Sequence, residues 1–196
     1  MKTAIPIMLA LVLCSCATSP ATHDERSALA DESRAALKSM MARDPGLKEF
    51  LGSAHAYAVF PEVGKGGFIV GGAFGHGAVF QQERLTGYAS ITQASVGGQI
   101  GARSFSQLLV FESPEAFERF TSGDLALGAE ATAIAIQTGV SATTHYHNGV
   151  AVFALPRGGL MADASISGQS FTFERVADAD ESDSGDAYSD TRDERD

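Results

Sequence analysis

The sequence predicts an α+β fold: a curved, glycine-rich and mainly antiparallel sheet, or a barrel-like core, with an N-terminal helix and one or two further helices. Apolar residues recur at helical spacing between residues 23 and 44, and short strand-like runs follow from residue 54. In addition, 11 of the 21 glycines fall between residues 64 and 101. Because glycine inside a strand marks a bulge, a tight bend or a close backbone approach, this cluster predicts a strongly curved sheet.

Helix start signals occur at two places. The segment Thr22–Glu25 has the Thr-x-x-Glu form of a capping box, so a helix should begin there and end at Asp44, which precedes Pro45. A short helical turn should follow over residues 47–51. Residues 113–120 open with serine, proline and glutamate, each of which is favoured at a helix start, and predict another helix.

Most of the remaining apolar runs predict strands with short antiparallel connections. Asn148 and Gly149 separate two such runs and predict a two-residue hairpin turn, because both positions tolerate positive φ. The segment 126–140 fits a helix or a strand, and its β-branched residues favour a strand from about residue 131. The other expected strands are 56–60, 66–74, 77–82, 87–92, 94–104, 105–112, 143–147, 150–155, 160–167 and 170–174.

The stretch KGGFIVGGAFGHGAVF, residues 65–80, does not fit a nucleotide-binding loop. A phosphate loop has its lysine after the glycines, at the entry to a helix, whereas Lys65 precedes them. The dinucleotide pattern that begins at Gly75 and Gly77 would need glycine where Phe80 stands. The glycines are therefore expected to serve packing and bending of the sheet.

The first 15 residues are expected to be a signal peptide, with a basic start and a short apolar run. Leu13-Cys14-Ser15-Cys16 resembles a bacterial lipobox, which predicts acylation of Cys16 and a tether over 16–22. The alternatives are a redox pair of the two cysteines or two inert thiols. By resemblance to bacterial lipoproteins, Ala17 suggests sorting to the outer membrane, with the protein facing the periplasm.

The formal net charge is −10, and residues 178–196 contribute nine acids against two arginines. The segment 177–196 is expected to be a disordered acidic tail, because it has too few apolar residues to offset the entropy of ordering. The folded domain is expected over residues 23–176. A nucleic-acid-binding domain normally shows a basic surplus, which this one lacks, so no nucleic-acid partner is expected.

Three blocks carry a family resemblance: AVFPEVGKGGFIVGGAFGHGAV, SVGGQIGA and RGGLMADASISG. They resemble the SYLF domain, a lipid-binding module also known from yeast actin-binding proteins, and the resemblance covers roughly residues 29–175. It implies phospholipid or phosphoinositide binding, and actin bundling in some eukaryotic members. The chain departs from the family pattern at 88–91 and at 137–140, and the second departure removes a cation from a headgroup site.

Four basic residues are the candidate lipid-binding residues. Lys65 and Arg157 each adjoin a Gly-Gly pair, where backbone N–H groups and a cation could converge on an anion; a solvated turn cation is the alternative. Arg103 and Arg84 complete the set. His145 and His147 supply only two of the three or four ligands of a zinc site, so no metal is expected.

No nucleophile elbow is present, and neither a cofactor nor catalysis is expected. The sequence predicts an envelope lipoprotein that binds membrane phospholipids through anionic headgroups. The alternative is an envelope structural or protein-interaction module without lipid binding.

Overall fold

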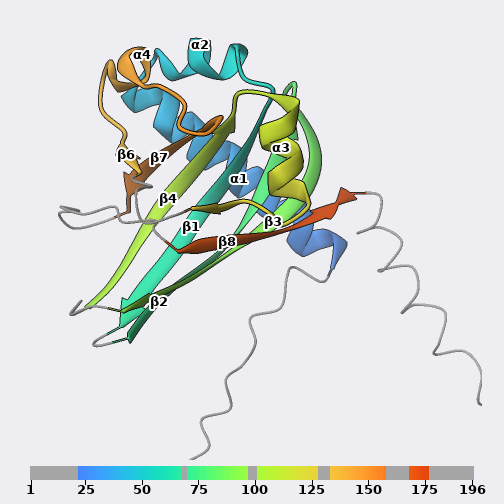
Figure 1. The fold of residues 1–196 in the computed structure, drawn as a ribbon, viewed down its shortest axis with the longest axis vertical. Coiled ribbons are helices and arrows are strands. Elements are labelled where there is room, and N and C mark those ends of the chain that lie inside the picture. Colours follow the sequence, from blue (N-terminus) through green and yellow to red (C-terminus); the bar gives the residue numbers. More distant parts are fainter. Residues whose placement is uncertain (1–21, 68–69, 97–100, 128–132, 158–167, 177–196) are drawn as a thin grey trace, which may run out of the picture.

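The computed structural model describes residues 22–67, 70–96, 101–127, 133–157 and 168–176. Within these ranges it forms an eight-stranded sheet with helices on both sides (Figure 1). Among the described strands only β6 and β7 pair in parallel, which confirms the predicted α+β class and mainly antiparallel sheet. The elements are α1 (His23–Arg43), α2 (Leu47–Gly52), β1 (Ala56–Gly67), β2 (Val70–Gln81), β3 (Arg84–Val96), β4 (Gly101–Phe111), α3 (Pro114–Thr121), β5 (Ala126–Leu127), β6 (Ile134–Ala135), α4 (Val140–Thr143), β7 (Val150–Pro156) and β8 (Gln169–Arg175).

The sheet curls into a half-barrel. Its strand order is β5-β8-β3-β2-β1-β4-β7-β6, so β3, β2 and β1 separate β8 from β4. Even so, the Gln107 side chain of β4 donates to that of Gln169 in β8 at 2.7 Å and accepts from it at 3.1 Å. Side chains on strands so far apart in the ladder can meet only across the inner side of a curled sheet, and the predicted curvature is confirmed.

The core lies in two layers, one on each face of the sheet. Neighbouring residues of β1 enter different layers, as a strand's period of two requires: Tyr57 packs with α1 and Ala58 with α3. Met40 of α1 and Phe120 of α3 are fully buried, and each contributes about 1.5–3 kcal/mol by leaving water. Phe120 packs against Phe111 with ring centroids 4.8 Å apart.

The predicted helix starts are confirmed at atomic level. Thr22 Oγ1 accepts from the backbone N–H of Glu25, and the Glu25 carboxylate accepts from that of Thr22, both at 3.3 Å. Ser113 Oγ accepts from the backbone N–H of Ala116 at 3.3 Å, and Pro114 is the first residue of α3. In each case a side-chain oxygen takes over a backbone donor that has no partner within the helix.

The glycines of β2 allow it to approach β1 where β1 bulges. The register shifts between Val59 and Glu62 of β1. A Cβ added at Gly75 would lie 2.6 Å from the carbonyl oxygen of Glu62, and one added at Gly77 would lie 2.7 Å from Cδ1 of Phe60. No side chain fits at either distance. The glycines therefore serve packing, as predicted, and residues 70–81 form a strand where a phosphate loop would lead into a helix.

The structure corrects several strand limits. Gly66 and Gly67 end β1. Residues 70–81, which include parts of the predicted strands 66–74 and 77–82, form the single strand β2, because ladders with β1 and β3 on both sides continue through its glycines. The predicted strand 94–104 is divided between β3 and β4. The predicted strand 160–167 lies outside the described residues.

The Asn148–Gly149 turn is confirmed, with φ of 51° and 77°. The strand expected before it, residues 143–147, is wrong, because only His147 forms an isolated bridge, to Val150. The unpredicted helical turn α4 ends at Thr143, where this strand was expected to begin. Within the segment predicted as a strand from residue 131, the described part shows β6, which pairs with β7.

Candidate functional site

Three of the four predicted lipid-binding residues lie at one end of the sheet. Lys65 of β1 is the cross-strand partner of Arg103 of β4. The backbone N–H of Arg157, just after β7, donates to the carbonyl of Ser104 at 3.1 Å. Since β1, β4 and β7 are neighbours in the sheet, the backbones of three basic residues that lie up to 92 positions apart in the chain reach the same end of the sheet. Arg157 lies on the side of α1, beside Ala35, whereas Lys65 follows the strand alternation of Val63, which packs on the opposite face. This end of the sheet is called the basic end below.

The surroundings of Lys65 differ from the sequence prediction. Gly66 and Gly67, whose backbone N–H groups were expected to be available to an anion, continue β1 and pair with β2 and β4. Lys65 therefore projects from a strand, where the backbone N–H groups around it are used by the ladder. Any anion at this end would be held mainly by side-chain charge, because the expected cradle of free backbone donors is absent from the described part of β1.

Arg157 contacts the β1 bulge across the intervening strand β4. Its guanidinium donates to the carbonyl of Pro61 at 3.0 Å and to the carboxylate of Glu62 at 3.2 Å. Both partners of the ion pair are about half exposed, so the pair contributes little to stability, in the range of about 0–1 kcal/mol. Glu62 offsets one of the three charges at the basic end.

Arg84 lies apart from the other three. It begins β3 directly after the β2–β3 turn, whose residues Gln82 and Glu83 have φ of 50° and 65°. Gly67 and Gly71, beside the basic end, pair at the other end of the β1–β2 ladder, whereas Gln81, the cross-strand partner of Arg84, ends β2. The structure does not bring Arg84 into one site with Lys65, Arg103 and Arg157.

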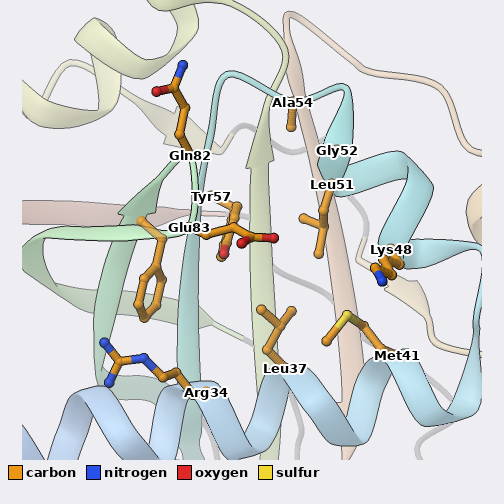
Figure 2. Close-up of a pocket in the computed structure, with 11 residues that line it drawn as sticks. Arg34, Leu37, Met41, Lys48, Leu51, Gly52, Ala54, Tyr57, Gln82 and Glu83 are labelled. Carbon is orange, nitrogen blue, oxygen red and sulfur yellow. The ribbon is translucent and has the colours of Figure 1, made fainter.

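A groove beside this turn was missed from the sequence. It has a volume of about 790 Å³ and lies between α1, α2, β1 and the β2–β3 turn. Figure 2 shows the side chains of Leu37, Met41 and Leu51 pointing into the space between the two helices and the strands. No motif predicts it, because its walls come from four separate segments. Its lining residues are Arg34, Leu37, Met41, Lys48, Leu51, Gly52, Ala54, Tyr57, Phe80, Gln82 and Glu83.

Charges lie around the rim of this apolar groove. Arg34 donates to Asp31 at 3.0 Å, and its guanidinium carbon lies 5.4 Å from the centre of the Phe80 ring. Tyr57 stacks on the same ring at 5.4 Å. Burial and the nearby charge of Glu83 raise the pKa of Tyr57, which Arg34 opposes in part. Its hydroxyl therefore stays protonated at neutral pH and remains available as a hydrogen-bond donor.

Asp44 fixes the helix junction that shapes the groove. Its carboxylate accepts from the backbone N–H groups of Ser141 at 2.7 Å, Gly139 at 3.0 Å and Gly46 at 3.3 Å. Burial alone would raise the pKa of Asp44, but the hydrogen bonds from Ser141, Gly139 and Gly46 together lower it below its ordinary value. The ionised carboxylate thus holds the end of α1 to α2 and α4, and with them two walls of the groove.

The structure places three histidines in two kinds of surroundings. His76 lies within β2, where its Nδ1 contacts Oγ of its cross-strand partner Ser90 at 2.9 Å, and burial lowers its pKa. His145 and His147 are both exposed. Among the described residues no three His, Cys, Asp or Glu side chains gather closely enough to hold a metal ion.

No helix in the described ranges is both long enough and apolar enough to cross a bilayer.

Two comparisons with known proteins bear on these sites. Residues 92–181 match the model of the Ysc84 family, described as Las17-binding protein actin regulator. The chain is also 26% identical over 161 residues to Beta cell expansion factor A of Aeromonas veronii. That alignment covers 80% of this chain and 60% of the relative, so the chain spans less than two thirds of the relative's length. Together the comparisons confirm the resemblance predicted from the sequence, and they identify residues 92–181 as a match to the Ysc84, or SYLF, domain family.

Proposed function

We propose that the protein is a non-catalytic lipoprotein of the bacterial envelope whose basic end binds the anionic headgroups of phospholipids. The observation that carries this proposal is the position of Lys65 on β1, Arg103 on β4 and Arg157 just after β7 at one end of the sheet. The chain has a formal net charge of −10, so three basic residues at one end of the sheet differ in charge from the chain as a whole.

The weak membrane affinity expected of the basic end explains why a lipid anchor is part of the proposal. A basic side chain near an anionic membrane contributes about 1 kcal/mol, so three of them give weak and salt-sensitive attachment. Stable attachment takes a second membrane signal. Acylation of Cys16, after removal of residues 1–15, would supply it, with residues 16–22 as tether and the outer membrane, facing the periplasm, as location.

The second candidate function is a structural or protein-interaction module of the envelope without lipid binding. The net charge of −10 favours it, because anionic headgroups would be repelled by most of the surface. The family description names an actin regulator that binds Las17, a role in protein interaction. One stoichiometric protein partner, with no phospholipid retained after gentle purification, would favour this candidate.

Vesicle flotation tests the first function. The chain from residue 16 onward, carrying Cys16→Ser, lacks both the apolar segment expected to be the signal peptide and the proposed acyl anchor, so any flotation reports the protein surface. We expect flotation with phosphatidylglycerol vesicles at low salt, much less with phosphatidylcholine vesicles, and loss of the difference at high salt. No association with either vesicle at low salt would refute headgroup binding.

Paired variants locate the binding surface. Lys65→Gln combined with Arg103→Gln removes two charges from the basic end and should abolish flotation with anionic vesicles. Arg84→Gln combined with Arg175→Gln also removes two charges, at the start of β3 and at the end of β8 beside it, and is the matched control that should float like the parent chain. Equal loss in both variants would mean that net charge, and not the basic end, determines the association.

A further inference from the structure

We propose that the groove between α1, α2 and the β2–β3 turn binds one long-chain fatty acid, with its hydrocarbon chain along α1 and its carboxylate at Lys48. This site is distinct from the basic end proposed for phospholipid headgroups: it adjoins Arg84, at the other end of the β1–β2 ladder. The two sites therefore make separate predictions.

The size and floor of the groove suit a hydrocarbon chain. Its volume of about 790 Å³ lies within the range of small-molecule pockets, about 300–1,000 Å³. Leu37 and Tyr57 are 8% exposed and Phe80 is 2% exposed, so the floor is well packed. Met41 and Leu51 on the walls remain half-buried. A hydrocarbon chain in the groove would remove this apolar surface from water, which is the main favourable contribution to such binding.

The shape of the groove favours a linear chain. Arg34, Leu37 and Met41 follow one another along one side of α1, which gives a strip about 10 Å long at a rise of 1.5 Å per residue. The opposite wall, at the end of α2, is low: Gly52 carries no side chain, and Ala54 carries only a methyl group. Figure 2 shows this strip of α1 facing the end of α2 across the groove.

The charges at the rim place the carboxylate at Lys48. In Figure 2, Arg34 and Lys48 lie at opposite ends of the groove. Arg34 is already paired with Asp31 and lies over Phe80. Lys48 forms no ion pair with the described residues, and its exposed ammonium group can turn toward an anion at the mouth of the groove. Glu83, beside Tyr57, would repel a carboxylate from the middle of the groove.

Gly52 offers a way to fill the groove without straining the fold. A Cβ added at this residue meets no atom within 4 Å, and its φ is not positive. With the Cys16→Ser protein used for flotation and 11-(dansylamino)undecanoic acid as fluorescent probe, Gly52→Phe should weaken binding at least roughly tenfold, a loss of about 1.4 kcal/mol. Gly52→Ala, the matched control, should bind within about twofold of the parent chain.

The headgroup contact has its own pair of variants. Lys48→Glu should weaken probe binding about two- to fivefold, as expected for a partly exposed ion pair. Lys38→Glu makes the same charge change at an exposed position of α1 that does not line the groove, and should leave binding unchanged. Unlabelled palmitate should displace the probe from the parent chain. A probe that palmitate does not displace would count against a fatty-acid site.

A measurement on the parent chain keeps the proposal testable if a variant fails to fold. Palmitate should protect Lys48, and not Lys38, from acetylation by acetic anhydride, read by peptide mass spectrometry. Equal acetylation of Lys48 with and without palmitate would overturn the carboxylate contact. A folded Gly52→Phe protein that binds the probe as tightly as Gly52→Ala would overturn the groove itself.

The same proteins separate this inference from phospholipid binding. Gly52→Phe should still float with anionic vesicles, and the Lys65→Gln, Arg103→Gln protein should still bind the probe. If flotation fails while probe binding and its loss in Gly52→Phe hold, the fatty-acid site stands without the headgroup function.

Discussion

The carboxylate of Asp44 accepts three backbone hydrogen bonds, from Gly46, Gly139 and Ser141, although the residue is only 1% exposed. A buried carboxylate is stable as an ion only when such donors compensate for lost hydration. The sequence predicts that Asp44, followed by Pro45, ends a helix. It does not predict the hydrogen bonds of Asp44 with Gly139 and Ser141, which lie 95 and 97 residues further along the chain, because these bonds depend on where the fold places α4.

We predict that Asp44→Asn lowers the free energy of unfolding by about 1.5–3 kcal/mol at pH 7, the usual value for charged hydrogen bonds. Because folding lowers the pKa of Asp44, its ionisation contributes stability that is fully present above its ordinary value of 3.8 and is lost as pH falls through the folded-state pKa. The difference in free energy of unfolding between the variant and the parent should therefore become smaller below pH 3.8. Urea denaturation at a series of pH values measures it.

Asp31→Asn provides the control for this prediction. It makes the same substitution at an exposed residue of α1 that pairs with Arg34, where about 0.5 kcal/mol or less is at stake. Two results would show that the buried carboxylate does not hold the junction. One is that Asp44→Asn loses no more free energy of unfolding than Asp31→Asn, and the other is that the destabilisation by Asp44→Asn does not change with pH.

At the scale of elements, the sequence predicted the features that depend on local signals, but it did not predict those that depend on strand pairing. The α1 and α3 starts and the Asn148–Gly149 turn depend on contacts within four residues, so the capping and turn residues suffice to find them. The limits of β1 and β2 depend on partners elsewhere in the chain. Glycine predicts a break when read alone, but ladders on both sides of β2 override that preference.

We predict that Gly77→Ala disrupts the approach of β2 to β1. The added Cβ would contact the carbonyl oxygen of Val59 and the ring of Phe60, so the strands must separate or the ring must leave its position. Overpacking of this kind costs about 1–3 kcal/mol. Thermal unfolding followed by circular dichroism should show a clearly lower midpoint.

Gly64→Ala is the matched control within the same ladder. Its Cβ would lie 3.9 Å from the carbonyl oxygen of Phe74, an ordinary contact, so its unfolding midpoint should stay close to that of the parent. If both variants unfold at the same temperature, close packing of the two strands does not explain the glycine at position 77.

At the scale of the whole molecule, the concentration of glycine predicted that the sheet curves. It did not predict which side chains make contact across the curved sheet. Gln107 and Gln169 are fully buried, and Gln169 also donates to Gln93 at 3.4 Å. A lone glutamine in an apolar strand gives no sign of its partner, because three other strands of the sheet lie between the two. The groove and the basic end were hidden for the same reason: each is assembled from segments that only the completed sheet brings together.

We predict that Gln107 and Gln169 are strongly coupled. Gln107→Leu or Gln169→Leu alone leaves a buried amide without the partner that it has across the half-barrel, at a cost of about 1–3 kcal/mol. The double variant removes both amides and should be more stable than the sum of the two losses predicts, by about 0.5–3 kcal/mol. Urea denaturation of the four proteins gives this coupling energy. A coupling near zero would mean that packing of the β1–β4 ladder curls the sheet without help from the amide pair. A large coupling would establish that two side chains, 62 residues apart, link β4 and β8 across the curved sheet.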